Sequence, residues 1–303
     1  MKKLFGSLLL LVTIGQAAIG QAPSFRELLK MYDYDSRAPL DLKEHGAQDR
    51  AGLKMLDISY LSPKGGRVPA YIVVPPGKGK FPGIIFMHPA GRDVGRSYFL
   101  DEAMALSKSG AISILIDSHF ARPSPQPLFA LTERDRDGMA QCVIDLRRAV
   151  DVLLSRGDVD ERRIGYIGFS YGATMGGILS GVEKRIKAFV LMGGGPKLSS
   201  WARTFQAPQV DRLRQEGKFE AYLSAIATID PDQYVKHAAP SAILFQSGRR
   251  DENVPVEEAA KYHQAASEPK TVKWYDAGHS LNDEARRDRA AWLSHLLGIK
   301  TER

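Results

Sequence analysis

The sequence is nearly free of cysteine, with Cys142 the single one among 303 residues. One cysteine cannot form an internal disulfide, so a disulfide scaffold is excluded, and a chain of this length can bury a full core without disulfides or metals. Cys142 falls on an apolar stripe at helical spacing, which predicts a buried side chain. A catalytic thiol needs an exposed, electropositive setting, so Cys142 is not expected to be a nucleophile.

Long apolar runs are also scarce. The run Leu4–Ile14 follows two lysines, is too short to cross a bilayer comfortably, and precedes small residues at Ala18 and Gly20. This layout predicts a signal peptide over residues 1–20, cleavage near Gly20 and an exported protein, periplasmic or secreted. The alternative is a buried N-terminal helix. No second long apolar run follows, so we expect no membrane span in the mature protein.

Charge of one sign is not concentrated in any segment. The formal net charge is +7, but basic and acidic residues alternate, as they do over residues 283–289. Mixed charge of this kind is typical of a solvated surface, and we therefore expect no nucleic-acid partner.

From about residue 55 onward, short apolar runs alternate with helical patterns. The run Gly83–Met87 is continuously apolar, as expected for a strand that is buried on both faces. Other strands are predicted at residues 56–60, 70–74, 111–116, 164–169, 188–192, 242–245 and 271–275, and the clearest helices at 138–154 and 256–266. Alternating strands and helices imply right-handed crossovers. The predicted fold class is therefore α/β, a single domain over residues 21–303 with helices on both faces of a mostly parallel central sheet.

Two long connections interrupt this pattern. One is rich in proline and follows the strand that ends near Asp117, and the other spans about residues 193–240 and carries five aromatic residues. Long connections at strand ends are usually functional in this class of fold. We expect the second to form a small helical cap of two short helices over a pocket. The alternative is a decoration on the solvent side of the body.

The central motif is G-x-S-x-G, formed by Gly168, Ser170 and Gly172 with one residue in each gap. A predicted buried strand leads into it and a helix-compatible run leads out, which is the strand–turn–helix setting of a nucleophile elbow. Such a turn strains the serine, and the glycines two positions away give it room. We therefore predict that Ser170 is a nucleophile. The alternative is a glycine-rich turn with an incidental serine.

A serine nucleophile needs a base, and in this kind of site the partners follow in the order serine, acid, histidine. His279 follows the predicted strand 271–275 in a loop, where an imidazole that solvent can reach is expected. The remaining histidines precede Ser170, fall within helical patterns or come before the strand that should supply the acid. They are His45, His88, His119, His237, His263 and His295.

The acid should follow the preceding strand. Asp251 comes shortly after the apolar run 242–245 and just before a predicted helix, so it is the predicted acid. A helix cap or a turn residue is the alternative for this position. Asp276 is the nearest rival, but it lies only three residues before His279 at the same strand end, where the usual crossing geometry is not expected.

An oxyanion hole requires two N–H groups directed at the developing charge. One is predicted to be the amide of Tyr171, directly after the nucleophile. The other should come from the loop after the strand Gly83–Met87. Because Pro89 has no N–H, Ala90 is the candidate donor. We expect His88 to brace this loop by hydrogen bonding rather than to act in catalysis.

Together these features resemble the α/β-hydrolase superfamily, and most closely its branch of dienelactone-hydrolase-like, acetyl-xylan-esterase-like and prolyl-oligopeptidase-like catalytic domains. The resemblance covers about residues 55–298. It rests on His88-Pro89, on Asp145–Arg148 before Asp160–Gly165, and on Gly168–Ala173, Gly248–Asp251 and Gly278-His279. The resemblance implies an acyl-transfer mechanism that uses a Ser–His–Asp triad, with no cofactor and no metal.

The chain departs from these relatives at three points. Many of them have His-Gly where this sequence has His88-Pro89, and dienelactone hydrolases proper carry a cysteine at the position of Ser170. Prolyl-oligopeptidase relatives carry a large propeller domain before the catalytic one, and about thirty polar residues after the leader cannot form one.

The function predicted from the sequence is therefore hydrolysis of a small-molecule carboxylic ester through an acyl-enzyme intermediate. An exported serine peptidase of the prolyl-oligopeptidase-like type is the main alternative. A non-catalytic binding protein on a hydrolase scaffold is a further alternative, against which the complete and correctly ordered triad argues.

Overall fold

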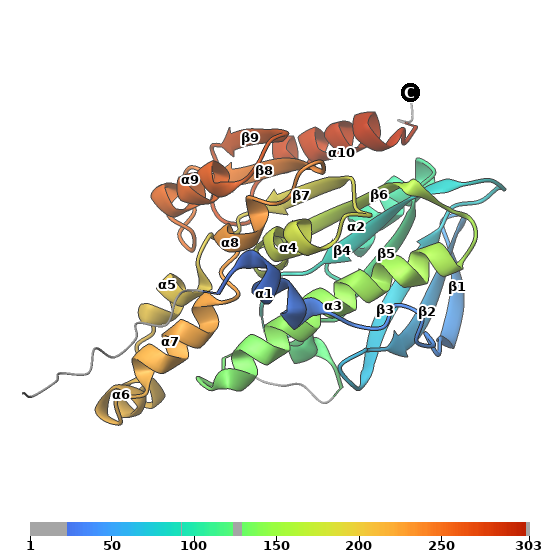
Figure 1. Ribbon diagram of the computed structural model, residues 1–303. Coiled ribbons are helices and arrows are strands. Elements are labelled where there is room, and N and C mark those ends of the chain that lie inside the picture. The colour runs from blue at the N-terminus through green and yellow to red at the C-terminus, as the bar shows by residue number, and fades with distance from the viewer. Residues whose placement is uncertain (1–22, 92, 124–128, 301–303) are drawn as a thin grey trace, which may run out of the picture.

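A computed structural model describes residues 23–91, 93–123 and 129–300. Its centre is a nine-stranded sheet in the order β1-β2-β3-β5-β4-β6-β7-β8-β9 (Figure 1). The strands are β1 (Lys43–Arg50), β2 (Leu53–Leu61), β3 (Arg67–Val74), β4 (Phe81–Met87), β5 (Ile112–Ile116), β6 (Val159–Phe169), β7 (Ala188–Met192), β8 (Ala242–Gly248) and β9 (Lys270–Tyr275). The predicted signal peptide, residues 1–20, lies outside the described residues.

The sheet is mostly parallel, which confirms the predicted fold class. Strands β5, β4, β6, β7, β8 and β9 pair in parallel, whereas β1, β2 and β3 are antiparallel to their neighbours. Helices cover both faces of the parallel strands, and every residue of β4 after Phe81 is buried. Parallel strands end at a common edge, so the loops that follow β4, β6, β8 and β9 gather there.

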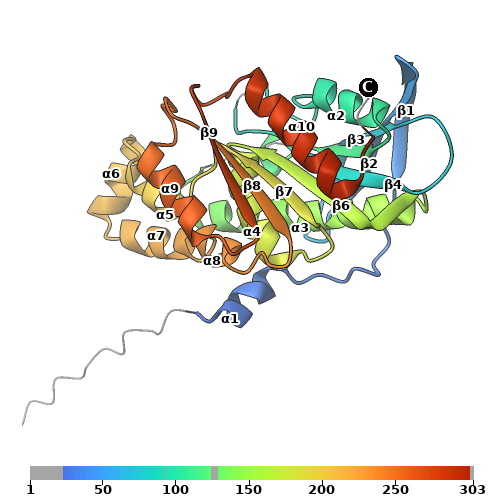
Figure 2. The ribbon, with the colours of Figure 1, turned by 90° about the horizontal axis from the view of Figure 1, so that it is seen from above.

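Two layers of helices enclose the sheet (Figure 2). On one face lie α3 (Glu133–Ser155), α4 (Tyr171–Val182) and α9 (Val256–Ala265), and on the other lie α2 (Leu100–Lys108) and α10 (Asp283–Leu297). Each layer buries its own hydrophobic cluster against the sheet, with Tyr166 in the first and Phe86 in the second. Cys142 lies buried in α3, as predicted, and burial raises the pKa of its thiol to about 12.

The N-terminal segment is more ordered than the sequence pattern predicts. Residues 23–53 show no strong period, yet they contain α1 (Phe25–Leu29), the 3₁₀ helix η1 (Lys30–Tyr32) and strand β1. Ser24 and Glu27 form a reciprocal capping box at the start of α1. Strand β1 lies at the sheet edge and is exposed along its whole length, so no alternation of apolar residues marks it.

A buried arginine fastens the N-terminal segment to α3. Arg148 is 1% exposed and donates hydrogen bonds to the carbonyl oxygens of Ser36 and Ala38 and to the carboxylate of Asp151, the last at 2.9 Å. Asp151 also accepts from the hydroxyl of Tyr34 at 2.9 Å. The segment is therefore held by polar contacts to a buried side chain.

The insertion over residues 193–240 contains four helices instead of the expected two. They are α5 (Leu198–Arg203), α6 (Pro208–Gln215), α7 (Phe219–Ala227) and α8 (Asp232–Val235). Pro208 starts α6, and Gly217, with a φ of 67°, separates α6 from α7, so the segment divides into more short helices than the two expected. The hydroxyl of Tyr222 on α7 donates to Asp135 of α3 at 2.9 Å, which ties this helical insertion to the body.

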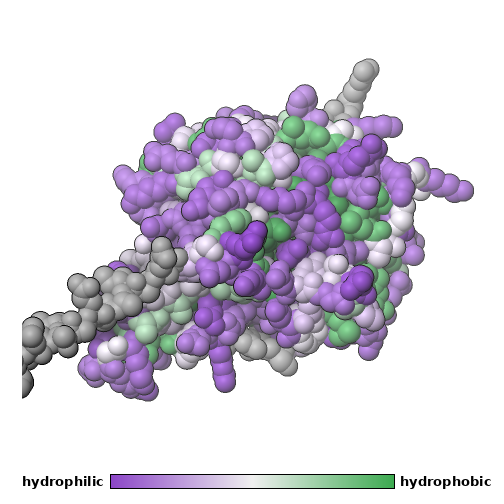
Figure 3. All heavy atoms as spheres, in the orientation of Figure 1, coloured by the Kyte–Doolittle hydropathy of each residue, from purple (hydrophilic) through white to green (hydrophobic). Residues whose placement is uncertain are grey.

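The face of the molecule that Figure 1 presents is mostly polar. Figure 3 shows a mostly hydrophilic face, with hydrophobic residues in small separate groups. Among the helices of residues 23–300 that are described, none is long and apolar enough to cross a membrane.

Replacement of Arg148 by methionine tests the fastening of the N-terminal segment. We expect Arg148→Met to lower the free energy of unfolding by about 2 kcal/mol, because two carbonyl groups lose a buried donor and Asp151, which keeps its ion pair with Arg185, loses one of its partners. Arg162→Met is the matched control, since the Arg162 side chain is 84% exposed and its loss should cost less than about 0.5 kcal/mol. Urea unfolding measures both values. Equal losses of stability in the two variants would show that Arg148 does not fasten the N-terminal segment to α3.

Buried His263 predicts an acid-sensitive contribution to stability. Its Nε2 lies 3.1 Å from the Ser247 hydroxyl, and burial lowers its pKa from 6.5 to about 4. The unfolded chain therefore takes up this proton first, and stability is lost as the pH falls from 6.5 towards 4. Between pH 7 and pH 4.5, we expect the free energy of unfolding of His263→Gln to fall by about 2 kcal/mol less than that of the wild type, as measured by urea unfolding. Parallel pH profiles of the two proteins would refute this.

Candidate active site

Ser170 lies in a sharp turn between β6 and α4. Its backbone has φ 52° and ψ −110°, a conformation that L-residues rarely adopt. The turn leaves no room for side chains beside it: a Cβ at Gly168 would lie 2.4 Å from the carbonyl oxygen of Gly172, and one at Gly172 would lie 2.2 Å from that of Met87. The two glycines therefore permit the strained serine, as the motif predicts.

Three side chains from separate loops meet at this turn. Ser170 Oγ lies 2.9 Å from His279 Nε2, and His279 Nδ1 lies 2.9 Å from both carboxylate oxygens of Asp251. These residues follow β6, β9 and β8 at the common edge of the parallel strands. An ionised carboxylate only accepts hydrogen bonds, so Nδ1 carries the proton and Nε2 is free to accept from the serine hydroxyl.

Asp251 is held in place from a second side. Its Oδ1 accepts the backbone N–H groups of Asn253 and Val254, each at 2.8 Å, and its side chain is only 2% exposed. The rival acid, Asp276, has a side chain that is 81% exposed and forms an ion pair with Arg250 at 3.1 Å. The structure therefore brings Asp251, and not Asp276, to the imidazole.

The other described histidines make different contacts. His263 lies beside Ser247, His237 stacks on Phe25 with ring centroids 3.7 Å apart, and His45 lies 2.8 Å from the Ser59 hydroxyl. His279 is the histidine that the structure places on Ser170.

His88 connects the loops that follow β4 and β5. Its Nε2 accepts the N–H of Ser118 at 3.1 Å, so Nδ1 carries the proton and donates to the carbonyl oxygen of Pro89 at 2.7 Å. Burial lowers the pKa of His88 to about 4, which keeps the ring neutral and this pattern intact. His88 thus braces the loop by hydrogen bonding, as predicted.

This brace also sets the direction of the Ala90 amide. The peptide group between Pro89 and Ala90 is planar and trans, so its N–H points opposite to its carbonyl oxygen. Since the carbonyl faces His88, the N–H of Ala90 points away from the imidazole. The close approach of Gly172 to Met87 and His88 places this loop beside the first turn of α4, where the Tyr171 amide has no acceptor within the helix.

Three features around His279 are not among the predicted site residues. The ring of Phe169 lies 4.9 Å from that of His279, between centroids. Gly193, which has a φ of 57°, covers the imidazole from another direction. A Cβ at this position would lie only 3.2 Å from Cε1 of His279. Glu252 accepts the backbone N–H of His279 at 3.4 Å. Of these, only Gly193 had a visible sign, the run of three glycines that begins there.

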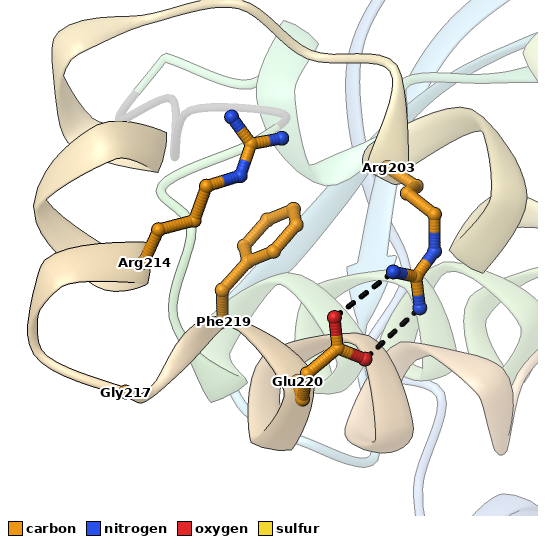
Figure 4. Close-up of a pocket in the computed structure, with 5 residues that line it drawn as sticks. All are labelled: Arg203, Arg214, Gly217, Phe219 and Glu220. Carbon is orange, nitrogen blue, oxygen red and sulfur yellow. Dashed lines mark hydrogen bonds and ion pairs between the residues drawn. The ribbon is translucent and has the colours of Figure 1, made fainter.

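A separate hollow of about 300 Å³ lies within the helical insertion. Arg203 and Glu220 face each other there through two hydrogen bonds of 2.9 and 3.0 Å, and the guanidinium of Arg214 lies 4.8 Å from the centre of the Phe219 ring (Figure 4). No residue of the Ser–His–Asp group is among those that line this hollow. It is therefore distinct from the candidate active site.

The chemistry open to this arrangement is nucleophilic attack by serine. A hydroxyl, an imidazole and a carboxylate connected in this order can move a proton from oxygen to nitrogen while the carboxylate fixes the tautomer. The N-terminus of α4 (Tyr171–Val182) points at the same hydroxyl and favours negative charge near it.

Known structures share this architecture. Acetyl xylan esterase 1 from Thermoanaerobacterium sp. JW/SL YS485 is similar with a TM-score of 0.76 at 17% identity, covering 90% of this chain and 93% of that one. An acetyl xylan esterase from Paenibacillus sp. R4 has a TM-score of 0.73 at 18% identity, with coverages of 89% and 92%. A cold-adapted esterase from an Arctic intertidal metagenomic library has a TM-score of 0.62 at 17% identity, with coverages of 84% and 99%.

Sequence comparison gives a more direct assignment. Curated protein sequences yielded no significant match. The family model for the prolyl oligopeptidase family, however, matches residues 133–298, a segment that makes up more than half of the chain and contains Ser170, Asp251 and His279. With the α/β-hydrolase sheet and its serine turn already in place, this match shows that the chain belongs to the prolyl oligopeptidase family, among the serine hydrolases of the α/β-hydrolase superfamily.

Proposed function

We propose that the protein hydrolyses carboxylic esters through a Ser–His–Asp triad and an acyl-enzyme intermediate. Ser170 Oγ attacks the ester carbonyl while His279 Nε2 takes its proton, and His279 then returns this proton to the departing alcohol. Water attacks the acyl-enzyme in the second half of the reaction, with the same histidine as base. The observation that carries the proposal is the row of contacts from Ser170 through His279 to buried Asp251.

The oxyanion would be held by two backbone N–H groups in this scheme. Tyr171 supplies one from the first turn of α4, and Ala90 supplies the other from the loop that His88 braces. Both groups are fixed before substrate arrives, and preorganised donors of this kind lower the barrier most effectively.

Two comparisons bear on the bond that is cleaved. The acetyl xylan esterases align with this chain over nearly the full length of both proteins, which favours an ester substrate. The prolyl oligopeptidase family match favours peptide hydrolysis as the second candidate. Both reactions use the same nucleophile, so kinetics on matched ester and amide substrates separate them.

We also propose that the protein is exported after cleavage of its signal peptide. N-terminal sequencing of the mature protein tests this, and a start near Gln21 is expected.

The role of Ser170 can be tested by one substitution. We expect Ser170→Ala to lower kcat for nitrophenyl acetate by about 10⁴-fold or more, because no other group takes its place. Labelling by a fluorophosphonate probe should disappear in the same variant. Ser224→Ala, which alters an exposed serine in α7, is the control and should retain both activity and labelling. Substantial residual hydrolysis by Ser170→Ala would exclude the proposed nucleophile.

The role of His88 is tested by its effect on the rate. We expect His88→Leu to lower kcat by about 10²- to 10³-fold with a smaller change in KM, because the Ala90 amide is no longer held in position. His88→Asn, which can still donate to the Pro89 carbonyl, should recover part of the rate. Urea unfolding of both variants shows whether they fold. A folded His88→Leu variant with a normal kcat would show that His88 does not position the Ala90 amide for catalysis.

A further inference from the structure

Tyr98 is a large aromatic residue that leaves 46% of its surface exposed. Its ring is supported from two directions: it stacks on Phe169 with centroids 6.0 Å apart and planes 19° apart, and it meets Phe99 edge-on at 4.9 Å. Single exposed aromatic residues are common and do not by themselves indicate a function. The neighbour on which Tyr98 stacks is what makes it informative.

Phe169 connects Tyr98 to the proposed base. It precedes Ser170 in the chain, is almost fully buried, and lies with its ring against the imidazole of His279. The Phe169 ring therefore contacts both the imidazole of His279 and the ring of Tyr98, and Tyr98 is the most exposed of the three. In the proposed mechanism His279 gives its proton to the leaving-group oxygen, so the leaving group must lie beside the imidazole that Phe169 contacts.

Buried contacts join the helices that follow Tyr98 and His279 in the chain. Glu102, at the start of α2, forms two hydrogen bonds of 2.6 Å with Arg289 of α10, and both side chains are less than 10% exposed. Helix α2 begins just after Tyr98, and α10 begins just after the loop of His279. The ring is therefore placed before any substrate binds, which reduces the entropy cost of binding.

We propose that the exposed face of Tyr98 binds the leaving group of the substrate, and that this group is an aromatic alcohol. This inference rests on the proposed function and narrows its substrate class. A phenol ring can stack, offset, on Tyr98, whereas a methyl group is too small to reach it. A sugar needs several hydrogen-bonding partners. The rings of Phe99 and Phe169 offer none, and Glu102 and Arg289 are paired with each other, which leaves the hydroxyl of Tyr98 as the polar group of this cluster.

Two acetate esters that differ only in their leaving group test the proposal. We expect Tyr98→Ala to lower kcat/KM for phenyl acetate by about five- to tenfold, and for methyl acetate by less than about twofold. Tyr98→Phe should retain both values, because the ring and not the hydroxyl makes the contact. Trp201→Ala is the matched control, since Trp201 is 47% exposed on the helical insertion and should not alter the ratio of the two substrates.

Other results on the same variants would overturn the inference. Equal losses with both esters would show a general structural role for Tyr98. A Tyr98→Phe variant that behaves like Tyr98→Ala would assign the effect to the hydroxyl group. A greater loss with an acetylated sugar than with phenyl acetate would exclude an aromatic leaving group as the preferred class.

A covalent probe separates this inference from the proposed ester hydrolysis. Ser170 Oγ forms a bond to phosphorus in a phosphonate, its proton passes to His279, and either nitrophenolate or fluoride leaves. We expect Tyr98→Ala to slow labelling by a nitrophenyl phosphonate about fivefold and to leave labelling by the matching fluorophosphonate unchanged. The readout needs the nucleophile but no ester turnover, so it holds even if the physiological substrate is a peptide. Equal slowing with both probes would refute the leaving-group site.

Discussion

The close approach of two backbone segments is the constraint on which the site depends. Gly172, in the first turn of α4, lies so near the end of β4 that a Cβ there would be 2.2 Å from the carbonyl oxygen of Met87. This contact holds Ser170 at a φ of 52° and brings the loop of His88 beside the start of α4. The candidate nucleophile and the candidate oxyanion donors are thus positioned by the same few atoms, and a single methyl group would separate them.

The parallel sheet brings residues that are far apart in the sequence close together in space. Residues 170, 251 and 279 meet because β6, β8 and β9 end at one edge, and each side chain leaves its strand within a few residues. The loops are short and well anchored: two amides hold Asp251, and Phe169 and Gly193 enclose the imidazole of His279. Little reorganisation is therefore needed for the proton to move, which is the condition for efficient general-base catalysis.

Sequence patterns predict the parts of this protein that have local causes. The strands buried on both faces appear as apolar runs, and the elbow appears as a strand, two glycines and a helix, so the fold class and Ser170 follow from them. Chain order then directs attention to His279 and Asp251. Strand β1 was missed because an exposed edge strand needs no apolar alternation. The stacking of Tyr98 on Phe169 was also missed, since contacts between residues 71 positions apart have no sequence signature.

The outer strands of the sheet have a consequence for how the molecule behaves at high concentration. Strand β1 at one edge reads Lys-Glu-His-Gly-Ala-Gln-Asp-Arg, and its register with β2 shifts between Glu44 and Gly46. Strand β9 at the other edge carries Lys270 and Lys273. Unpaired edges invite further strands to add, and charges and bulges oppose this. Both rims of the sheet thus discourage intermolecular strand pairing, which would favour the dispersed protein over aggregation.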